Sequence, residues 1–154
     1  MRMLKNLLIV FFVILPFKAL ALIEVDITRG NLNPLPIAVS PLSIDENSRK
    51  SFNKILKKNN IGSEISLVVE KNLRASGLFN PLNKDAFLQA PDIANLKPRF
   101  EDWNLIKAQA LITGKVNFVD DKLRVEFRLW DILAGKEMMA LAFTTVPNNW
   151  RRVG

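Results

Sequence analysis

Alternating apolar and polar positions predict a strand near the start of the chain. Ile23, Val25 and Ile27 fall on one side of residues 22–28, and Glu24, Asp26 and Thr28 on the other. This period of two is typical of a half-buried strand. Residues 36–41 then form a short apolar run bounded by prolines, which indicates an interior strand with both faces covered.

The period of two returns from Ala110 onward. It predicts a strand up to a turn at Asp120-Asp121, a second strand over residues 123–130, and a third over 138–146. These three antiparallel strands should form a meander with one apolar face on the helices and one charged face.

A helical period occupies the middle of the chain. Ile61, Ile65, Val68 or Val69, and Leu73 share one face of a helix predicted over residues 61–76. Asn60 is suited to cap its start and Gly77 to end it. A short edge strand is expected over 78–82, a helical turn over 85–88, and a second, shorter helix over 100–107.

The polar stretch over residues 43–60 admits two interpretations. Phe52, Ile55 and Leu56 could line a short helix packed loosely on the surface, or the stretch could be a flexible insertion. Its basic residues, Arg49 to Lys58, could also touch anionic lipid or an acidic partner.

Together these elements predict an α/β fold, in which a mixed β-sheet of about five strands packs against two helices. The sheet and helices are expected in a single domain over residues 22–154, because that length supports one core.

Residues 1–21 have the features of a secretory signal peptide. Arg2 and Lys5 precede an apolar run over 7–17, and Ala19-Leu20-Ala21 offers the small residues that signal peptidase accepts. The run is shorter than the roughly twenty residues that a membrane-spanning helix needs. We therefore expect cleavage after Ala21 and export.

Charge and composition narrow the function. The chain carries a formal charge of +7, and removing Arg2, Lys5 and Lys18 leaves 19 basic against 15 acidic residues, or +4. That excess is ordinary for a soluble domain and does not indicate nucleic-acid binding. Export also argues against nucleic acid, and we expect at most a peripheral association with membranes.

The chain contains no Cys and no His. Thiol nucleophiles, imidazole bases and the usual zinc ligands are therefore absent. The acidic pairs Asp45/Glu46, Glu101/Asp102 and Asp120/Asp121 fall at turns or helix starts, where solvated acids are common. We assign no catalytic residue, no cofactor and no metal site, and expect a protein that is not an enzyme.

Several blocks, in this order, resemble the N-terminal domain of the TolB family, the periplasmic component of the Tol-Pal system. They are residues 23–30 with 36–41, residues 73–82, residues 100–103 with 108–114, residues 125–131 and residues 149–152. Their order and spacing match through essentially the whole predicted mature chain. The stretch over 43–60 is longer than the corresponding link in the family.

The resemblance implies a role in docking. In the family an N-terminal α/β domain precedes a β-propeller, which is absent from these 154 residues. It implies the lipoprotein Pal as a partner of the propeller and the C-terminal domain of TolA as a partner of the mature N-terminus. The TolA contact would fall on Leu22, Ile23, Glu24, Val25, Asp26, Ile27 and Thr28. It also implies a periplasmic location and a contribution to outer-membrane integrity and cell division.

Two alternatives stay open from the sequence. Residues 22–28 could add a strand to a partner's sheet, or they could form the first strand of the domain's own sheet, and alternation alone does not separate these. The chain could also be an exported binding or assembly factor, unrelated to Tol, at the outer membrane or peptidoglycan.

Overall fold

The computed structural model describes residues 33–92 and 97–154. The chain divides into two units after residue 31, and the described residues all belong to the second, Leu32–Gly154. The predicted signal peptide and the predicted strand over 22–28 therefore lie outside the described residues.

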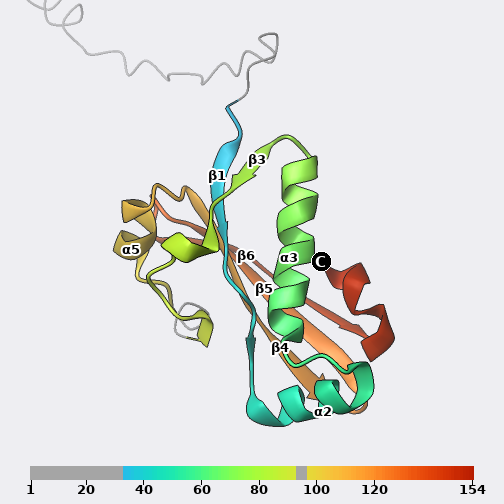
Figure 1. Cartoon of the computed structure of the whole chain (residues 1–154). Coiled ribbons are helices and arrows are strands. Elements are labelled where there is room, and N and C mark those ends of the chain that lie inside the picture. The colour runs from blue at the N-terminus through green and yellow to red at the C-terminus, as the bar shows by residue number, and fades with distance from the viewer. Residues whose placement is uncertain (1–32, 93–96) are drawn as a thin grey trace, which may run out of the picture. The chain divides into compact units, whose positions relative to one another are not determined.

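The predicted α/β class is confirmed (Figure 1). The elements follow one another as β1 (Leu35–Val39), β2 (Ser43–Ile44), α2 (Glu46–Leu56), α3 (Ile61–Ala75), β3 (Phe79–Pro81), the 3-10 helix η1 (Lys84–Ala86), α5 (Phe100–Leu105), β4 (Ala110–Val119), β5 (Lys122–Asp131), β6 (Lys136–Thr145) and the 3-10 helix η2 (Pro147–Val153).

The sheet is mixed and has the order β3-β1-β4-β5-β6. β1 runs parallel to both β3 and β4, whereas β4, β5 and β6 form the predicted antiparallel meander. β2 is a two-residue piece that pairs with β4 beyond the end of β1. The Ser40 backbone N–H still donates to the carbonyl oxygen of Ile112, but Pro41 has no N–H. The pairing with β4 is therefore interrupted at Pro41, which separates β1 from β2.

α3 confirms the helix predicted from the period of 3.6. Its start is capped by Asn60, whose side-chain oxygen accepts from the Ser63 N–H, and its buried face includes Ile61 and Ile65. Val68 packs against the same core cluster, which also contains Val116 and Val125 of the sheet. The helix therefore covers the face of the sheet that carries the even-numbered side chains of β4.

The expectation of a loosely packed surface helix over residues 43–60 is wrong in one respect. α2 is a helix, but Phe52 is 0% exposed and belongs to the core. Its ring meets the ring of Phe118 edge to face, with centroids 5.4 Å apart. The aromatic contact from β4 draws this side chain inward, because a buried ring pair adds to the free energy of apolar burial.

The opposite face of the sheet holds a second cluster beneath α5. Trp103 of this helix is buried with Leu111 and Trp130. Both indole N–H groups are satisfied, since Trp103 donates to the Gln89 side-chain oxygen at 2.7 Å and Trp130 donates to the Thr113 hydroxyl at 2.9 Å. α5 is two residues shorter than the predicted helix, and Lys107 adopts a positive φ of 62° just after it.

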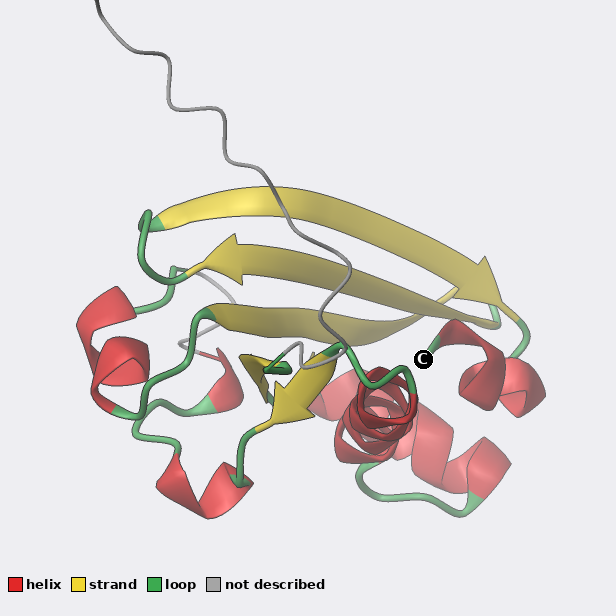
Figure 2. Cartoon of the chain, turned by 90° about the horizontal axis from the view of Figure 1, so that it is seen from above, coloured by secondary structure: helices red, strands yellow, loops and turns green. Residues whose placement is uncertain are grey.

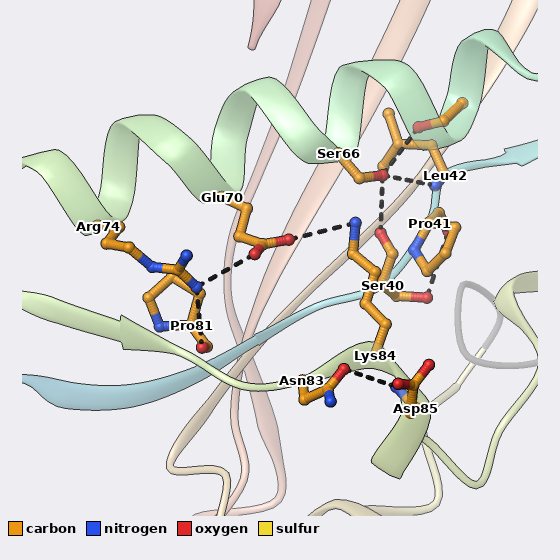
Figure 3. A network of polar contacts seen from close by, with 11 residues as sticks. Ser40, Pro41, Leu42, Ser66, Glu70, Arg74, Pro81, Asn83, Lys84 and Asp85 are labelled. Carbon is orange, nitrogen blue, oxygen red and sulfur yellow. Dashed lines mark hydrogen bonds and ion pairs between the residues drawn. The ribbon is translucent and has the colours of Figure 1, made fainter.

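A polar network fastens α3 to the break between β1 and β2 (Figure 3). The Leu42 N–H donates to the Ser66 hydroxyl at 3.1 Å, and that hydroxyl lies 3.1 Å from the Ser40 carbonyl oxygen. Further along the helix, the Glu70 carboxylate lies between Arg74 at 3.2 Å and Lys84 at 3.3 Å. Backbone groups left without strand partners near the prolines are thus satisfied by a helix side chain.

β6 takes its predicted place in the meander but is more exposed than predicted. Nearly all of its residues are exposed, although its apolar side chains were expected to face helices. Figure 2 shows β6 at the outer edge of the sheet, with no described helix drawn along that edge. α3 contacts β3, β1 and β4, and η2 contacts β5 and β6, yet nearly all of β6 stays exposed.

Candidate interaction surface

The predicted contact over Leu22 to Thr28 lies outside the described residues, so it stays a prediction. The first described strand, β1, begins at Leu35. Among the described residues, the two core clusters begin with Ala38 and Leu42.

The three acidic pairs serve local structure. Asp45 caps the start of α2, and Asp102 in the first turn of α5 accepts from the Arg99 guanidinium at 2.7 Å. Asp120 and Asp121 form the two-residue turn between β4 and β5, both with positive φ. Within residues 33–92 and 97–154 no group of three or more acidic side chains is placed to hold a metal ion.

Asp45 is tied to the sheet through one hydroxyl group. The Ser48 side chain donates to Asp45 at 2.6 Å and accepts from the backbone N–H of Phe118 at 2.8 Å. The hydrogen bonds from the Ser48 hydroxyl and backbone N–H hold the pKa of Asp45 below its usual value, because they favour the charged form. This constellation fixes α2 to β4 and offers no reactive group.

The basic stretch from Arg49 to Lys58 lies on α2 and just beyond it. Arg49 lies 3.5 Å from Glu46, and Lys58 lies 3.3 Å from Glu64. Lys58 also stands over the ring of Trp150, 5.2 Å from its centroid. Part of the stretch is therefore engaged in local pairs, which weakens its case as a free anionic-partner site.

One face of the meander is charged, as predicted. Glu126 of β5 lies 3.3 Å from Lys115 of β4 and 3.0 Å from Arg124. Partial burial opposes its ionisation, but the hydrogen bonds from these two cations prevail and hold the pKa of Glu126 below its usual value. Since the charges on this face pair with one another, it offers little net attraction to a charged partner.

The other face of the meander carries an exposed apolar surface, and here the structure differs most from the prediction. Met139, Leu141 and Phe143 are 50%, 48% and 42% exposed, and they stand side by side on β6 opposite β5 residues. A shallow cavity of about 240 Å³ lies over them. We call this surface the apolar face and define it by Val69, Ile112, Phe127, Leu129, Met139, Leu141, Phe143 and Val153.

The sequence pattern of β6 indicates an apolar side of the strand, but it does not indicate whether that side is covered. Met139, Leu141 and Phe143 have the spacing of a strand with one buried face, and the pattern does not say what buries it. The apolar face shares its side of the sheet with α3, whereas α5 packs against the other side. α2 and η2 pack on this side beside α3, through Phe52 and Trp150, yet Met139, Leu141 and Phe143 of β6 stay exposed.

Among residues 33–92 and 97–154, no helix combines the length and the apolar character needed to cross a bilayer.

Comparison with solved structures supports the fold. TolB from Acinetobacter baumannii superposes with a TM-score of 0.56 at 18% sequence identity, over 78% of this chain and 25% of that one. At that identity the likeness concerns the fold alone. It agrees with a mixed sheet covered by helices.

Comparison of sequences supports the family. The Tol-Pal system protein TolB of Pelagibacter ubique (strain HTCC1062) is 78% identical over 152 residues, which are 99% of this chain and 34% of that protein. The chain thus spans about a third of the length of this relative. The profile of the TolB amino-terminal domain matches residues 23–138. The chain belongs to the TolB amino-terminal domain family.

Proposed function

We propose that this domain acts in the periplasm as a non-enzymatic docking domain of the Tol-Pal envelope system. Residues 1–21 direct export and are removed after Ala21. The segment Leu22 to Thr28 then binds the C-terminal domain of TolA. Through that contact the domain contributes to outer-membrane integrity and cell division, and in longer relatives the propeller adds a contact with Pal.

Family membership is the observation that carries this proposal. The 78% identical relative is a Tol-Pal system protein, and the family profile begins at residue 23, within the proposed contact segment. The described polar clusters support it as well, because Asp45, Glu70 and Glu126 all serve local hydrogen bonds and ion pairs. They leave docking as the activity that fits the described surfaces.

Strand addition is the proposed mode of contact. The alternation of Ile23, Val25 and Ile27 would let the segment pair its backbone with the edge of a partner's sheet while these three side chains enter apolar pockets. Glu24, Asp26 and Thr28 would then face solvent. The backbone supplies affinity and the alternate side chains supply specificity.

The test uses the chain without residues 1–21 and a version that also lacks 22–28. We expect both to show the same far-ultraviolet circular dichroism and to unfold cooperatively, because residues 33–154 hold two core clusters of their own. Only the longer version should capture the purified C-terminal domain of TolA. Undiminished capture by the shorter version would eliminate the proposed contact.

A matched pair of triple variants tests the mode of binding. Replacing Ile23, Val25 and Ile27 with Ser should abolish capture, because it removes the side chains that enter the partner. Replacing Glu24, Asp26 and Thr28 with Ser leaves the apolar side of the strand intact and should preserve it. Equal loss in both variants would argue against a strand with one buried side.

A further inference from the structure

We propose that the outer edge of β6 is a pairing site for a second copy of this chain. The two β6 strands would pair antiparallel about a two-fold axis at Ala142 and join both sheets into one. This inference concerns the free edge of the sheet. It goes beyond the proposed function and does not rest on the TolA contact.

The two edges of the sheet differ in their protection against pairing. At one edge β3 has three residues and ends in Pro81, which has no N–H to offer. At the other edge β6 has ten residues, nearly all exposed, and Figure 2 shows it as the outermost strand. Residues 139–145 of β6 contain neither a proline nor a charge. Short strands, prolines and charges are the usual protection of an edge, so β6 is open to an added strand.

The turn between β4 and β5 determines which backbone groups of β6 point outward. This turn has two residues, Asp120-Asp121, both with positive φ, so the residues that flank it form a directly hydrogen-bonded pair. One of them is Lys122, and the even-numbered residues of β5 therefore direct their backbone groups toward β4, whereas the odd-numbered ones face β6. The register pairs these with odd-numbered residues of β6. The N–H and C=O groups of Ala140, Ala142 and Thr144 are thus left pointing away from the sheet.

The limits of the regular strand fix the centre of the pairing. The register with β5 shifts by one residue just before Met139, and β6 ends at Thr145, shortly before the proline that opens η2. The regular part is therefore residues 139–145, and its middle residue is Ala142. Antiparallel pairing about Ala142 uses the whole of this part. It also sets outward-pointing backbone groups of the two copies opposite one another, since Ala142 carries such groups.

The side chains of β6 suit pairing with themselves. On the charged face Ala142 would lie opposite Ala142 of the second copy, and Ala140 opposite Thr144, so only small side chains meet there. On the other face Leu141 would lie opposite Phe143 of the second copy, in a pair without direct hydrogen bonds, where side chains come closest. Apolar pairs of this kind across two strands stabilise a sheet.

The charges near this edge do not oppose the pairing. The register places Glu126 of β5 beside Ala142, and Lys115 and Arg124 lie 3.3 Å and 3.0 Å from its carboxylate. In the paired sheet the two Glu126 positions would lie three strand spacings apart, about 14 Å, which exceeds the Debye length of about 8 Å at physiological ionic strength. A two-fold pair also closes on itself, because each copy uses the same edge.

The first experiment traps the pair through single cysteines, since the chain contains none of its own. In the chain without residues 1–21, Ala142→Cys sets two thiols on the axis, with Cα atoms about 5.5 Å apart, within reach of a disulfide. Oxidation with diamide should give a covalent dimer as the main product. Ala140→Cys is the control on the same strand and face, and its two copies would lie about 13 Å apart along the strand, too far for a disulfide.

A mixture of two variants tests the register further. Ala140→Cys and Thr144→Cys should each stay monomeric when oxidised alone, because neither residue lies opposite its own copy. Oxidised together in equal amounts, they should form the mixed dimer. Formation of the mixed dimer by this pair and of the symmetric dimer by Ala142→Cys identifies the same axis twice.

Sedimentation of the chain without cysteines tests the association itself. We expect a monomer at about 10 μM and a growing dimer fraction toward about 500 μM, because a strand pair of this length is smaller than a standard interface. Ala142→Lys sets two like charges opposite each other and should lower that dimer fraction at least about fivefold. Ala134→Lys, on an exposed alanine of the turn before β6, is the control and should keep it. Equal thermal unfolding midpoints of the two lysine variants show that both are folded.

Three results would overturn the proposal. Ala142→Cys could fail to form the covalent dimer, or Ala140→Cys could form it equally well. The chain could also remain monomeric up to about 500 μM, or form a dimer that Ala142→Lys leaves intact, which would assign the association to another surface. None of these measurements involves TolA, so failure here is distinct from failure of the proposed function.

Discussion

Gly62 in α3 faces the carbonyl oxygen of Leu42 so closely that a methyl group on its Cα would overlap that oxygen. The Leu42 N–H points back at the helix, where it donates to the Ser66 hydroxyl at 3.1 Å. Backbone therefore packs on backbone at the break between β1 and β2, and the small size of residue 62 sets how near α3 comes to the sheet.

This contact predicts a reversal of the usual effect of glycine replacement. Gly→Ala inside a helix ordinarily stabilises by about 1 kcal/mol. Gly62→Ala should instead lower the free energy of unfolding by about 1–3 kcal/mol, because the strand or the helix must shift to admit the methyl group. Urea unfolding at neutral pH measures it. Ser63→Ala, one position along and partly exposed, is the control and should be neutral or slightly stabilising.

A second prediction concerns the buried hydrogen bond between Trp130 and Thr113. Thr113→Val keeps the shape of the side chain but leaves the indole N–H without its acceptor, which should cost about 1–3 kcal/mol. Trp130→Phe removes the donor, so in that background Thr113→Val should cost little. A double-mutant cycle by urea unfolding gives the coupling. Equal cost in both backgrounds would mean that packing, and not the hydrogen bond, is responsible.

The lowered pKa of Asp45 predicts a dependence of stability on pH. Because its pKa in the folded state lies below the ordinary value of 3.8, the unfolded chain binds its proton first as the pH falls. The stabilisation is therefore complete above about pH 4 and is lost as the pH drops through the folded-state pKa. Asp45→Ala should cost about 1 kcal/mol at pH 7, the usual value for a helix cap.

The measurement for Asp45 is the free energy of unfolding of the natural chain and of Asp45→Ala, taken at several values from pH 7 down to pH 3. The difference in the free energy of unfolding between the natural chain and Asp45→Ala should become smaller toward pH 3. Protonation removes the charge of the Asp45 carboxylate, which the substitution also removes. Glu46→Gln changes the adjacent acid and keeps the bonds to Ser48, so its gap should not follow the same course. A constant gap for Asp45→Ala would contradict the charge-based account.

The turn between β4 and β5 offers a stabilising substitution. Asp120 and Asp121 have φ of 49° and 57°, a conformation that glycine adopts without steric cost. Asp121→Gly should raise the free energy of unfolding by about 0.5–1 kcal/mol. Gly135, with φ of 63° in the next turn, gives the opposite control, because Gly135→Ala should destabilise. If the thermal unfolding midpoints of both variants shifted in the same direction, this explanation would be excluded.

Periodicity predicted which segments form helices and strands, but not how deeply their side chains are buried. The spacing of Phe52, Ile55 and Leu56 indicated the apolar side of a helix, yet only the structure shows that Phe52 is fully buried while Ile55 stays half exposed. The difference arises from Phe118, a residue far along the chain that the local pattern cannot include. Tertiary contact, and not local propensity, sets burial here.

Two small residues on the buried face of α3 were not predicted, for a related reason. Gly62 and Ser66 lie on the buried face of α3 and hold the helix against the β1–β2 break, but neither contributes to an apolar pattern. The apolar face escaped because alternation on β6 predicts a buried side without specifying the covering element. The proposed contact over residues 22–28 rests on alternation in the same way, and the described residues do not test it.

The central place of β4 has a consequence for the order in which the domain assembles. On one edge β4 joins β5 through a two-residue turn, a contact that a short stretch of chain can form in microseconds. On its other edge it pairs Ile37 with Ala110, which requires a long loop to close first. Because synthesis runs from the N-terminus, β1 and α3 emerge together with β3, the earlier partner of β1, but the other edge of β1 stays unpaired until β4 follows.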